Sequence, residues 1–423
     1  MKYLIATFIL LFTLSGSHVF SSDTAPETTT YLLRGRVLGA DTNQPLPNAG
    51  ITVEQSNVST VTNQDGYFSI RVPSASRNSR LIIRHLGYEN HNIPIVTLIN
   101  RPNNHIRLIP SSIELGEIQV LAGDGTELVR EALRRISRNF SNEPNMMVAF
   151  YRESIRRGSN NFISLVEAVL DVYKASYTSF ASDQARIYIG RRATDISPRD
   201  TLLLRFQGGI TGALMLDIAK NPKIVFGIAG EEYHFHITGM TAINDRPHYI
   251  ISFQQRPYID YILFRGTIFL DVETLAFARM EFYMNVEGRR DASNIFIRRM
   301  PPRMEIEIDR ARYFVDFIED NGTWFFNYSS MELDLRVRWR NRLFGLFATN
   351  YSIRSEMAIT DRYTEDVTRF PRAERIRPTD VIVERVEHFQ DPYFWGEYTV
   401  IEPEQQITDA IRRLSGRLQR RNR

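Results

Sequence analysis

The feature that most constrains the fold is a regular alternation of apolar and polar residues between Glu231 and Val286. Four strand-like runs follow one another there, joined by short polar turns. A period of two places every second side chain on the same face of a strand. The apolar members of the runs are Tyr233, Phe235 and Ile237, then Tyr249, Ile251 and Phe253, then Phe264, Ile268 and Leu270, and finally Ala278, Met280, Phe282 and Met284. The pattern predicts a four-stranded antiparallel meander with one apolar face.

Length and composition set the limits for the rest of the chain. A chain of 423 residues is long enough for two or three domains, and 43% apolar with 24% charged residues is ordinary for a globular protein. The net charge of +3 is small and the two signs are interspersed, so we expect no nucleic-acid partner. The chain has no cysteine, which excludes disulfides, thiolate metal sites and a lipidated cysteine.

Residues 1–22 have the pattern of a secretory signal peptide. Lys2 is followed by an apolar stretch from Tyr3 to Leu14, and small residues follow that stretch. The apolar stretch is too short to cross a bilayer as a helix, and no later one reaches that length. We therefore expect an exported protein without a membrane span after cleavage, in the periplasm or at the outer membrane.

Short strand-like runs separated by turn signals occupy residues 31–121. Pro and Asn cluster between Asp41 and Ala49, and Asn63 to Gly66 is a second turn signal. Strands at a spacing of about 8–12 residues are typical of a β-sandwich.

A family resemblance rests on the same residues. The pieces that carry it are Gly35-x-Val37, Pro45-Leu46-Pro47-Asn48-Ala49-x-Ile51-x-Val53, Thr62-x-x-Asp65-Gly66-x-Phe68 and Gly87-Tyr88. They resemble the carboxypeptidase-regulatory-like domain, a transthyretin-like sandwich of about seven strands that is common in exported Bacteroidetes proteins. Residues 114–120 are similar to the strand that often follows this domain. The resemblance implies a fold and a location, and no chemistry.

Residues 124–140 are expected to form a linker helix. Asp124 and Glu127 have the spacing of a capping box. Leu128, Ala132, Leu133, Ile136 and Phe140 recur at helical period, while arginines occupy the other positions. The helix either packs on the sheet of the second domain or lies on a membrane surface.

Residues 145–400 are predicted to form one large curved antiparallel sheet, like a half-barrel, with helices against it. Asp320-Asn321-Gly322 indicates a tight hairpin, and Gly208, Gly209 and Gly212 are expected on a loop before a short helix. A final helix from Pro403 to Leu418 leads into a basic tail, within a segment of residues 403–423.

The body of the chain also resembles a known but functionally unassigned domain. The matching pieces are Phe150-Tyr151-Arg152-Glu153, Gln207-Gly208-Gly209, Gly266 to Asp271, Leu275-Ala276-Phe277 and Phe394-Trp395-Gly396-x-Tyr398. They are similar to the domain that follows this sandwich in many Bacteroidetes proteins. The meander is also similar, over one or two strands, to outer-membrane lipoprotein carriers.

The usual signatures of hydrolases and nucleotide-binding enzymes are absent from the sequence. Each of the eight histidines lacks a Glu three residues later, as a zinc peptidase would require. The sequence has no Gly-x-Ser-x-Gly elbow and no phosphate-binding glycine loop. We therefore expect a non-enzymatic protein without catalytic residues or a cofactor.

Glu232, His234 and His236 are the best candidates for a metal site. They alternate along one strand and so share a face, and His248 in the next strand could join them. Two imidazoles and a carboxylate suit Zn²⁺. The alternative is a solvated polar face.

Three further groups have both a functional and a structural interpretation. Carboxylates at strand spacing (Asp316, Glu319 and Asp320; Glu305, Glu307 and Asp309) could form an acid/base pair or a solvated face. A proline-containing segment and a group of aromatic residues (Met300-Pro301-Pro302; Trp324, Phe325, Phe326 and Tyr328) could line a sugar or lipid groove or belong to the core. Terminal arginines (Arg412, Arg413, Arg417, Arg420, Arg421 and Arg423) could bind anionic headgroups or end a solvated helix.

The sequence thus predicts a mainly β, two-domain protein of the cell envelope. The leading hypothesis is a binding protein for an apolar or lipid ligand, or for an envelope partner. It rests on the long sheet with one apolar face and on the absence of a catalytic signature from the sequence. The alternative is an adaptor that docks an outer-membrane protein through the sandwich by strand addition. A glycan or peptide hydrolase is the third possibility.

Overall fold

The computed structural model describes residues 30–111, 123–159, 161–194, 209–227, 230–296, 304–339, 348–388, 394–396 and 398–421. Strands dominate this part of the chain, which confirms the mainly β fold class. The predicted signal peptide and the predicted strand at residues 114–120 lie outside the described residues.

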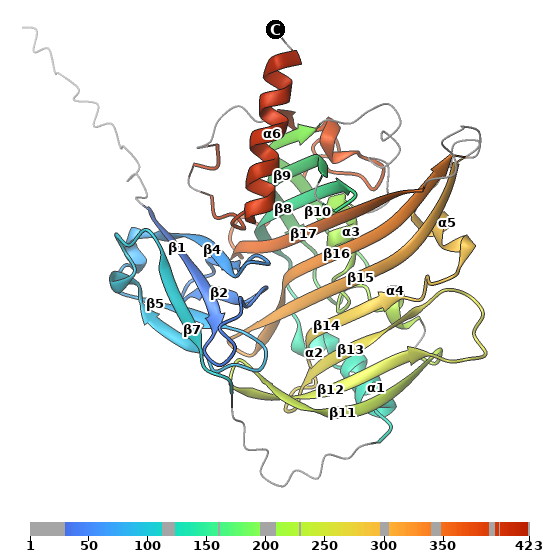
Figure 1. Cartoon of the computed structure of the whole chain (residues 1–423). Coiled ribbons are helices and arrows are strands. Elements are labelled where there is room, and N and C mark those ends of the chain that lie inside the picture. Colours follow the sequence, from blue (N-terminus) through green and yellow to red (C-terminus); the bar gives the residue numbers. More distant parts are fainter. Residues whose placement is uncertain are drawn as a thin grey trace, which may run out of the picture.

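The N-terminal domain is built from a three-stranded sheet of order β4-β1-β7 and a four-stranded sheet of order β3-β2-β5-β6 (Figure 1). Its core contains Val37, Ile51, Phe68, Leu81 and Ile106, all of them buried. The strands are β1 (Thr30–Gly39), β2 (Gly50–Val53), β3 (Ser59–Val61), β4 (Tyr67–Pro73), β5 (Arg80–Arg84), β6 (His91–Pro94) and β7 (Asn104–Leu108), with 3₁₀ turns at Ser74–Ser76 and Ile95–Thr97.

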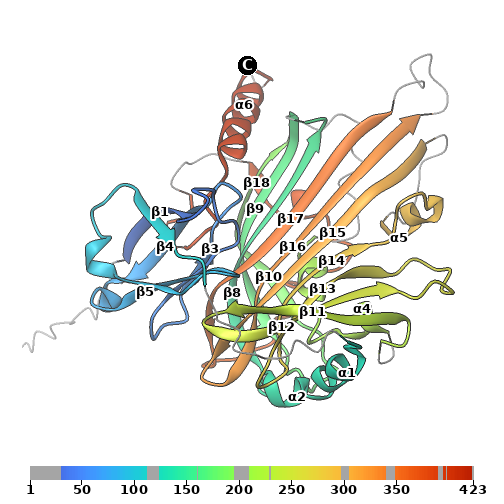
Figure 2. The same ribbon diagram turned by 60° about the horizontal axis from the view of Figure 1, so that its bottom comes forward.

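The large sheet has the order β11-β12-β13-β14-β15-β16-β17-β8-β9-β10-β18. Its neighbouring strands are antiparallel except for β10 and β18, and it curves without closing into a barrel (Figure 2). The strands are β8 (Asn145–Arg157), β9 (Asn161–Lys174), β10 (Gln184–Thr194), β11 (Tyr233–Ile243), β12 (Arg246–Gln255), β13 (Phe264–Asp271), β14 (Phe277–Met284), β15 (Met304–Asp320), β16 (Thr323–Trp339), β17 (Thr349–Tyr363) and β18 (Glu387–His388). The predicted meander is confirmed as β11 to β14, and the predicted apolar positions are buried apart from Tyr249, which is partly buried.

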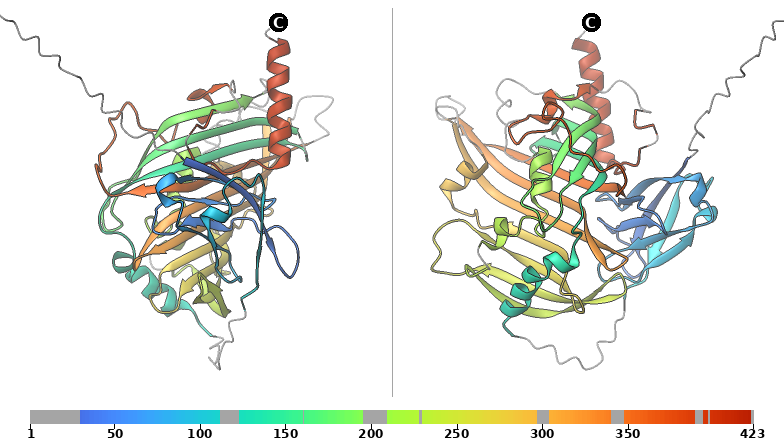
Figure 3. Two further views of the ribbon diagram at one scale, coloured as in Figure 1. Left: turned by 90° about the vertical axis from the view of Figure 1, so that its left-hand side faces the viewer. Right: turned by 180° about the vertical axis from the view of Figure 1, so that it is seen from behind.

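Helices cover the concave face of this sheet, as the view from behind shows (Figure 3). They are α1 (Thr126–Arg134), α2 (Ile136–Asn139), α3 (Gly209–Met215) and α4 (Lys223–Phe226); α5 (Ser293–Phe296), with a 3₁₀ turn at Arg290–Ala292, and α6 (Gln405–Arg421) lie elsewhere, as does the 3₁₀ turn at Ile382–Glu384. The long α6 packs Ile407 and Ala410 against Phe162 and Leu165 of β9.

The linker helix differs from its prediction at two points. It breaks at Arg135, which separates α1 from α2. The expected capping box does not form: Gly125 is the N-cap, while the Asp124 carboxylate accepts from the backbone N–H of Thr126 at 2.9 Å. Glu127 pairs instead with Arg130, so its side chain turns along the helix. Ala132, Ile136 and Phe140 are buried in the core of the large sheet, where the helix was expected to pack.

The two glycine signals had different outcomes. Asn321 and Gly322 both have positive φ angles, 50° and 82°, as a two-residue type I′ turn requires, and they join β15 to β16. Gly209 and Gly212, which were expected on a loop, lie inside α3. That expectation was wrong because the helix is held by tertiary contact: the Ser329 hydroxyl donates to the Ala213 carbonyl at 3.0 Å.

The sandwich and a C-terminal segment, residues 394–396 and 398–404, lie against the other face of the large sheet (Figure 1). Ser59 of β3 donates to the Ile359 carbonyl of β17 at 2.8 Å, and Asn63 donates to the Glu402 carbonyl at 2.9 Å. The C-terminal segment therefore touches both domains and fixes one against the other.

Candidate functional site

The concave face of the large sheet is filled by the chain's own aromatic side chains. Phe226 of α4 lies 5.9 to 6.2 Å, between ring centres, from Phe235, Phe253 and Phe277 of the meander. Val129 and Ala132 of α1 are buried on the same face. Helix residues thus occupy the space over the meander that an apolar ligand would need.

The candidate metal ligands do not converge. His234 and His236 are exposed on the polar face of β11, as their alternation predicts, and His234 faces Arg256 at 3.4 Å. His248 is fully buried and lies opposite Thr241, five residues along β11 from His236, which corresponds to about 16 Å. In the described ranges, groups of three His, Cys, Asp or Glu side chains suited to an ion are absent.

Each of the candidate acid/base carboxylates has a cationic partner. Asp316 accepts from Arg279 at 2.9 Å, Asp320 accepts from Arg362 at 3.1 Å, and Glu319 lies 3.8 Å from Arg246. On β15, Glu307 and Asp309 pair with Arg336, and Glu305 lies 4.0 Å from Arg338. The structure therefore shows cross-strand ion pairs rather than two carboxyl groups that face each other across a cleft.

The aromatic and arginine groups follow their structural interpretation where they are described. Trp324, Phe326 and Tyr328 are buried. Phe325 lies under the Arg362 guanidinium, 3.5 Å from its carbon to the ring centre. Arg412 faces Asp409 at 3.7 Å on α6. Met300 to Pro302 and the side chains of Arg417, Arg420, Arg421 and Arg423 lie outside the described residues.

A buried ion network lies where the C-terminal segment crosses the large sheet, and no sequence pattern indicated it. Arg152 donates to Glu167 at 2.9 Å, to Glu356 at 3.2 Å and to the carbonyl of Ile401 at 2.6 Å. Arg152, Glu167 and Glu356 are 1–3% exposed. Burial lowers the pKa of Arg152, but the carboxylates of Glu167 and Glu356 outweigh it and raise that pKa. The Arg152 guanidinium is therefore held in its charged form, and its bond to the Ile401 carbonyl anchors the C-terminal segment.

The motif around Phe150 and the motif around Trp395, which are far apart in the sequence, meet at this network. Phe150, next to Arg152, packs edge-on against Trp395 with 5.6 Å between ring centres. Arg191 of β10 pairs with Glu167 at 2.9 Å and lies over the Trp395 ring at 4.6 Å. The network thus connects the C-terminal segment to β10, which lies next to the outer edge of the sheet.

One edge of the large sheet, that of β11, is paired by other parts of the chain. Gly125 donates to the Phe235 carbonyl at 3.0 Å, and Ile237 donates to the Gly123 carbonyl at 2.9 Å. Nearer the other end of β11, Gly87 of the sandwich donates to the Ala242 carbonyl at 3.2 Å. Unpaired strand edges are sites of association with other chains, and these bonds cover the β11 edge at Phe235, Ile237 and Ala242.

The other edge, that of β10, is paired only at its two ends. Ile376 donates to the Ala185 carbonyl at 2.8 Å, and β18 pairs with Arg191 and Arg192. Between these points, within the described part of the chain, no main-chain hydrogen bond joins residues 186–190 to residues 370–386. A bulge at Tyr188 interrupts the pairing of β10 with β9, and the Tyr188 side chain is 58% exposed.

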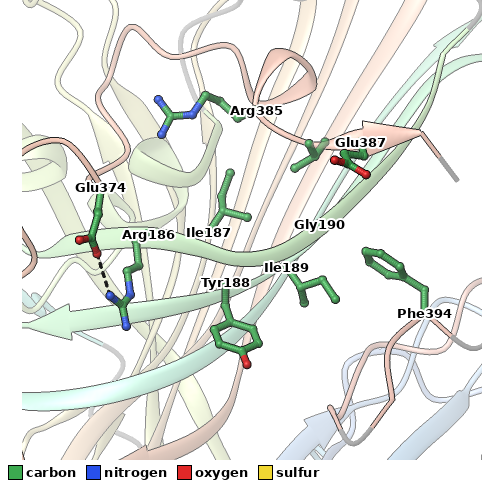
Figure 4. Close-up of a pocket in the computed structure, with 10 residues that line it drawn as sticks. Arg186, Ile187, Tyr188, Ile189, Gly190, Glu374, Arg385, Glu387 and Phe394 are labelled. Atoms are coloured by element: carbon green, nitrogen blue, oxygen red, sulfur yellow. Dashed lines mark hydrogen bonds and ion pairs between the residues drawn. The ribbon is translucent and has the colours of Figure 1, made fainter.

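A hollow of about 660 Å³ lies along this unpaired stretch (Figure 4). Ile187, Ile189, Val386 and Phe394 give it apolar walls. At one end Arg186 donates to Glu374 at 2.8 Å, and Arg385 and Glu387 add one charge of each sign. A volume in this range suits a ligand or a few residues of an extended peptide.

Sequence reasoning missed both elements that make the hollow. The alternation of Ile187 and Ile189 with polar neighbours was a usable signal for β10, but it is short and ends in Gly190. The two-residue β18 pairs across almost 200 positions and has no local signal.

Comparison with known proteins supports the resemblance of the N-terminal sandwich. A family model for the CarboxypepD_reg-like domain matches residues 33–120, in agreement with the resemblance of the sandwich. No curated protein matches the chain. Among solved structures, a DUF1329 family protein from Desulfovibrio piger matches with 13% identity over 58% of this chain and 96% of that one. Its TM-score of 0.24 is too low to support an argument.

Helices that could cross a membrane are absent from the described residues. The comparisons show a carboxypeptidase-regulatory-like domain at residues 33–120, and the structure shows that the chain is mainly β.

Proposed function

We propose that this protein is a non-enzymatic adaptor of the cell envelope that binds an extended peptide of a partner protein along the outer edge of β10. The observation that carries the proposal is the unpaired stretch of residues 186–190 beside a hollow of about 660 Å³. Strand addition uses such an edge: main-chain bonds supply affinity, and pockets for alternate side chains supply specificity.

The hollow fits this mode better than it fits a small apolar ligand. Its apolar walls lie on both sides of the strand edge, since Ile187 packs against the concave core and Ile189 against the opposite cluster. An extended peptide presents alternate side chains to the two sides of a sheet. The short length and the bulge at Tyr188 protect the edge from indiscriminate pairing, so only a segment that suits the hollow would bind.

The same observations make the adaptor more attractive than the apolar-ligand carrier. A carrier needs free apolar space under the curved sheet, and Phe226 fills the space over the meander. On the sandwich, the β4 and β3 edge strands are already contacted by other parts of the chain. Thr399 accepts from the backbone N–H of Arg71 on β4, and Ser59 of β3 is bonded to β17. Export to the cell envelope is also part of the proposal, because it rests on the signal-peptide pattern of residues 1–22.

Site-specific photo-crosslinking tests the proposal. Tyr188 is replaced by benzoylphenylalanine in cells that produce the protein, and Tyr258, which is 74% exposed, receives the same replacement as a control. We expect an ultraviolet-dependent adduct at position 188 that position 258 does not give. The crosslinked segment is mapped by mass spectrometry, and a synthetic peptide of that segment should bind the purified protein. Equal adducts at both positions, or a mapped peptide that does not bind, would contradict the proposal.

A further inference from the structure

Three connections of the large sheet lie on one side of the molecule. They join β12 to β13, β14 to β15 and β16 to β17. The neighbouring strands from β12 to β17 are antiparallel, so every second connection falls on the same side. The β12–β13 connection and α5 accordingly follow one margin of the molecule, at the right of Figure 1 and of Figure 2. We call this margin the rim, and its described residues are 256–263, 285–296, 304–307, 336–338 and 348.

Contacts between the connections make the rim a continuous surface. Arg289 donates to the Asp260 carbonyl at 2.7 Å and pairs with Asp291 at 3.1 Å, which joins the β12–β13 connection to the turn before α5. A hollow of about 790 Å³ continues from there to the ends of β15 and β16. Its charged lining residues are Arg289, Arg290, Arg336, Arg338, Glu305 and Glu307.

Large apolar side chains are exposed on the rim. Tyr258 is 74% exposed, Tyr261 54% and Ile295 41%. Tyrosine is typical of the boundary between lipid and water, where its ring lies among the headgroups and its hydroxyl stays hydrated. Single exposed apolar residues are normal on a soluble protein, whereas a group of them beside a charged hollow indicates an interaction surface.

Charge indicates which partner fits the hollow. Arg336 pairs with Glu307 at 2.9 Å. Arg338 lies 4.0 Å from Glu305. The exposed Arg290 has no acidic partner in the described part of the chain, so its guanidinium is available to an anion.

The chain outside the described residues adds to this charge. Residues 297–303 follow Phe296, and residues 340–347 follow Trp339, so both begin and end at the rim. Their sequences, IRRMPPR and RNRLFGLF, hold five arginines and no acidic residue, together with Ile, Met, Leu and Phe. The described rim holds five arginines and five acidic residues, so the rim with its connections carries +5, whereas the whole chain carries only +3.

This combination favours lipid over other anionic partners. Arginines beside large apolar side chains suit a surface that is anionic outside and apolar beneath, as a bilayer is. A nucleic acid would satisfy the arginines but would leave the apolar side chains in water.

We infer that the rim docks this protein on an anionic lipid surface. Tyr258, Tyr261 and Ile295 enter the headgroup layer, while Arg290 and Arg338 contact lipid phosphates from the hollow. The contact is peripheral and reversible, because each arginine near such a surface raises the affinity only about fivefold. Docking on lipid is independent of peptide binding at β10, since β17, β8 and β9 separate the two surfaces in the sheet.

Vesicle co-sedimentation of the full chain without its predicted signal peptide tests this inference. The vesicles contain phosphatidylcholine alone or an equal mixture of phosphatidylcholine and phosphatidylglycerol. We expect binding to the mixed vesicles at low salt, binding about tenfold weaker to the neutral ones, and release at high salt, which screens exposed charges. Equal binding to the two kinds of vesicle, or no binding to the mixed kind, would overturn the inference. Sedimentation without vesicles would overturn it in favour of self-association.

Paired variants locate the contact. Arg290→Glu should weaken binding to the mixed vesicles by about tenfold or more, and Arg101→Glu, at an exposed position of the sandwich, is its control. The double change Tyr258→Ser and Tyr261→Ser should also weaken binding. Its control is Phe180→Ser, a fully exposed residue of the β9–β10 connection at the opposite ends of the strands. Unchanged binding in both rim variants, or equal losses in the controls, would overturn the inference.

A tryptophan at position 258 reports insertion into the lipid. We expect the emission of Tyr258→Trp to shift to shorter wavelength with the mixed vesicles, and that of Phe180→Trp to stay unchanged. A shift that is absent at position 258, or the same at both positions, would contradict docking through the rim. In the crosslinking experiment, contact of position 258 with lipid would give a lipid adduct, which differs in mass from a protein one.

Discussion

The two edges of the large sheet are built differently. At β11, main-chain atoms from the linker and from the sandwich pair with Phe235, Ile237 and Ala242. At β10, the chain pairs with Ala185 and with Arg191 and Arg192, and it leaves the five residues between them beside a hollow. The β11 edge is thus bonded to two other parts of the chain, whereas the unpaired stretch of β10 borders a hollow. That contrast is what makes the unpaired stretch a functional candidate.

The support behind the two edges differs as well. The β11 edge rests on main-chain bonds and aromatic packing, while the β10 edge rests on charges buried between β8, β9, β17 and the C-terminal segment. Buried ion pairs are weak evidence for net stability, but the loss of one partner is strongly destabilising. Single substitutions can therefore alter one edge at a time.

The largest effect is expected from Arg152→Ala. This change leaves Glu167 and Glu356 buried without their common partner, which should lower the free energy of unfolding by about 3–5 kcal/mol. Urea unfolding measures it. The control is Arg310→Ala, which removes an exposed pair with Asp334 and should cost less than about 1 kcal/mol. Equal losses in the two variants would show that the network does not anchor the C-terminal segment.

The next effect comes from opening the paired edge. Gly125→Pro removes the N–H that bonds to the Phe235 carbonyl and should lower the free energy of unfolding by about 1–3 kcal/mol. Gly125→Ala is the control because it keeps the N–H, although its Cβ would lie 3.0 Å from Ile251. If both variants lose the same stability, bulk rather than the lost hydrogen bond is responsible.

A fall in pH should lower the free energy of unfolding near the β11 edge through protonation of His85. Burial, assisted by the charge of Arg279, lowers the pKa of His85 to about 4, although two backbone carbonyls act against this. Because the unfolded chain takes up the proton first, His85 contributes its full stability above about pH 6.5 and loses it as the pH falls toward 4. The loss should be at most about 2 kcal/mol, given that the ring is partly exposed.

The measurement for His85 is the urea midpoint at pH 7 and pH 4.5, in the wild type and in His85→Gln. The variant should show a smaller difference between the two pH values. Identical differences would show that acid acts through other groups, such as Glu356, whose pKa the nearby Arg354 and Arg152 lower despite its burial.

The smallest effect is expected at the unpaired edge. Arg186→Ala removes exposed pairs with Asp171 and Glu374 and should change the free energy of unfolding by less than about 1 kcal/mol. It should nonetheless change peptide affinity, because Arg186 and Glu374 form one end of the hollow. A large loss of stability would mean that this edge is part of the folded core rather than a docking site.

The sequence predicted what local pattern can predict. Alternation located the meander, and Asn321-Gly322 located the β15–β16 hairpin, because period and turn chemistry are properties of neighbouring residues. The linker helix was placed by its apolar period, yet its break at Arg135 has no local signal.

The candidate site depends on contacts between distant residues. Arg152, Glu167 and Glu356 come from β8, β9 and β17, and the Ile401 carbonyl that Arg152 also contacts comes from the C-terminal segment, so the network joins residues far apart in the sequence. The hollow exists because β18 returns to β10 from almost 200 residues away. A single sequence carries no record of such pairing.

Hydrogen–deuterium exchange of main-chain amides tests the central claim most directly, in the free protein and with the peptide mapped by crosslinking at Tyr188. We expect residues 186–190 to exchange much faster than residues 235–242 in the free protein, and to become protected when the peptide is added. Slow exchange of residues 186–190 in the free protein would show that this edge is already closed. Protection that appears anywhere except along β10 would show that the peptide docks elsewhere.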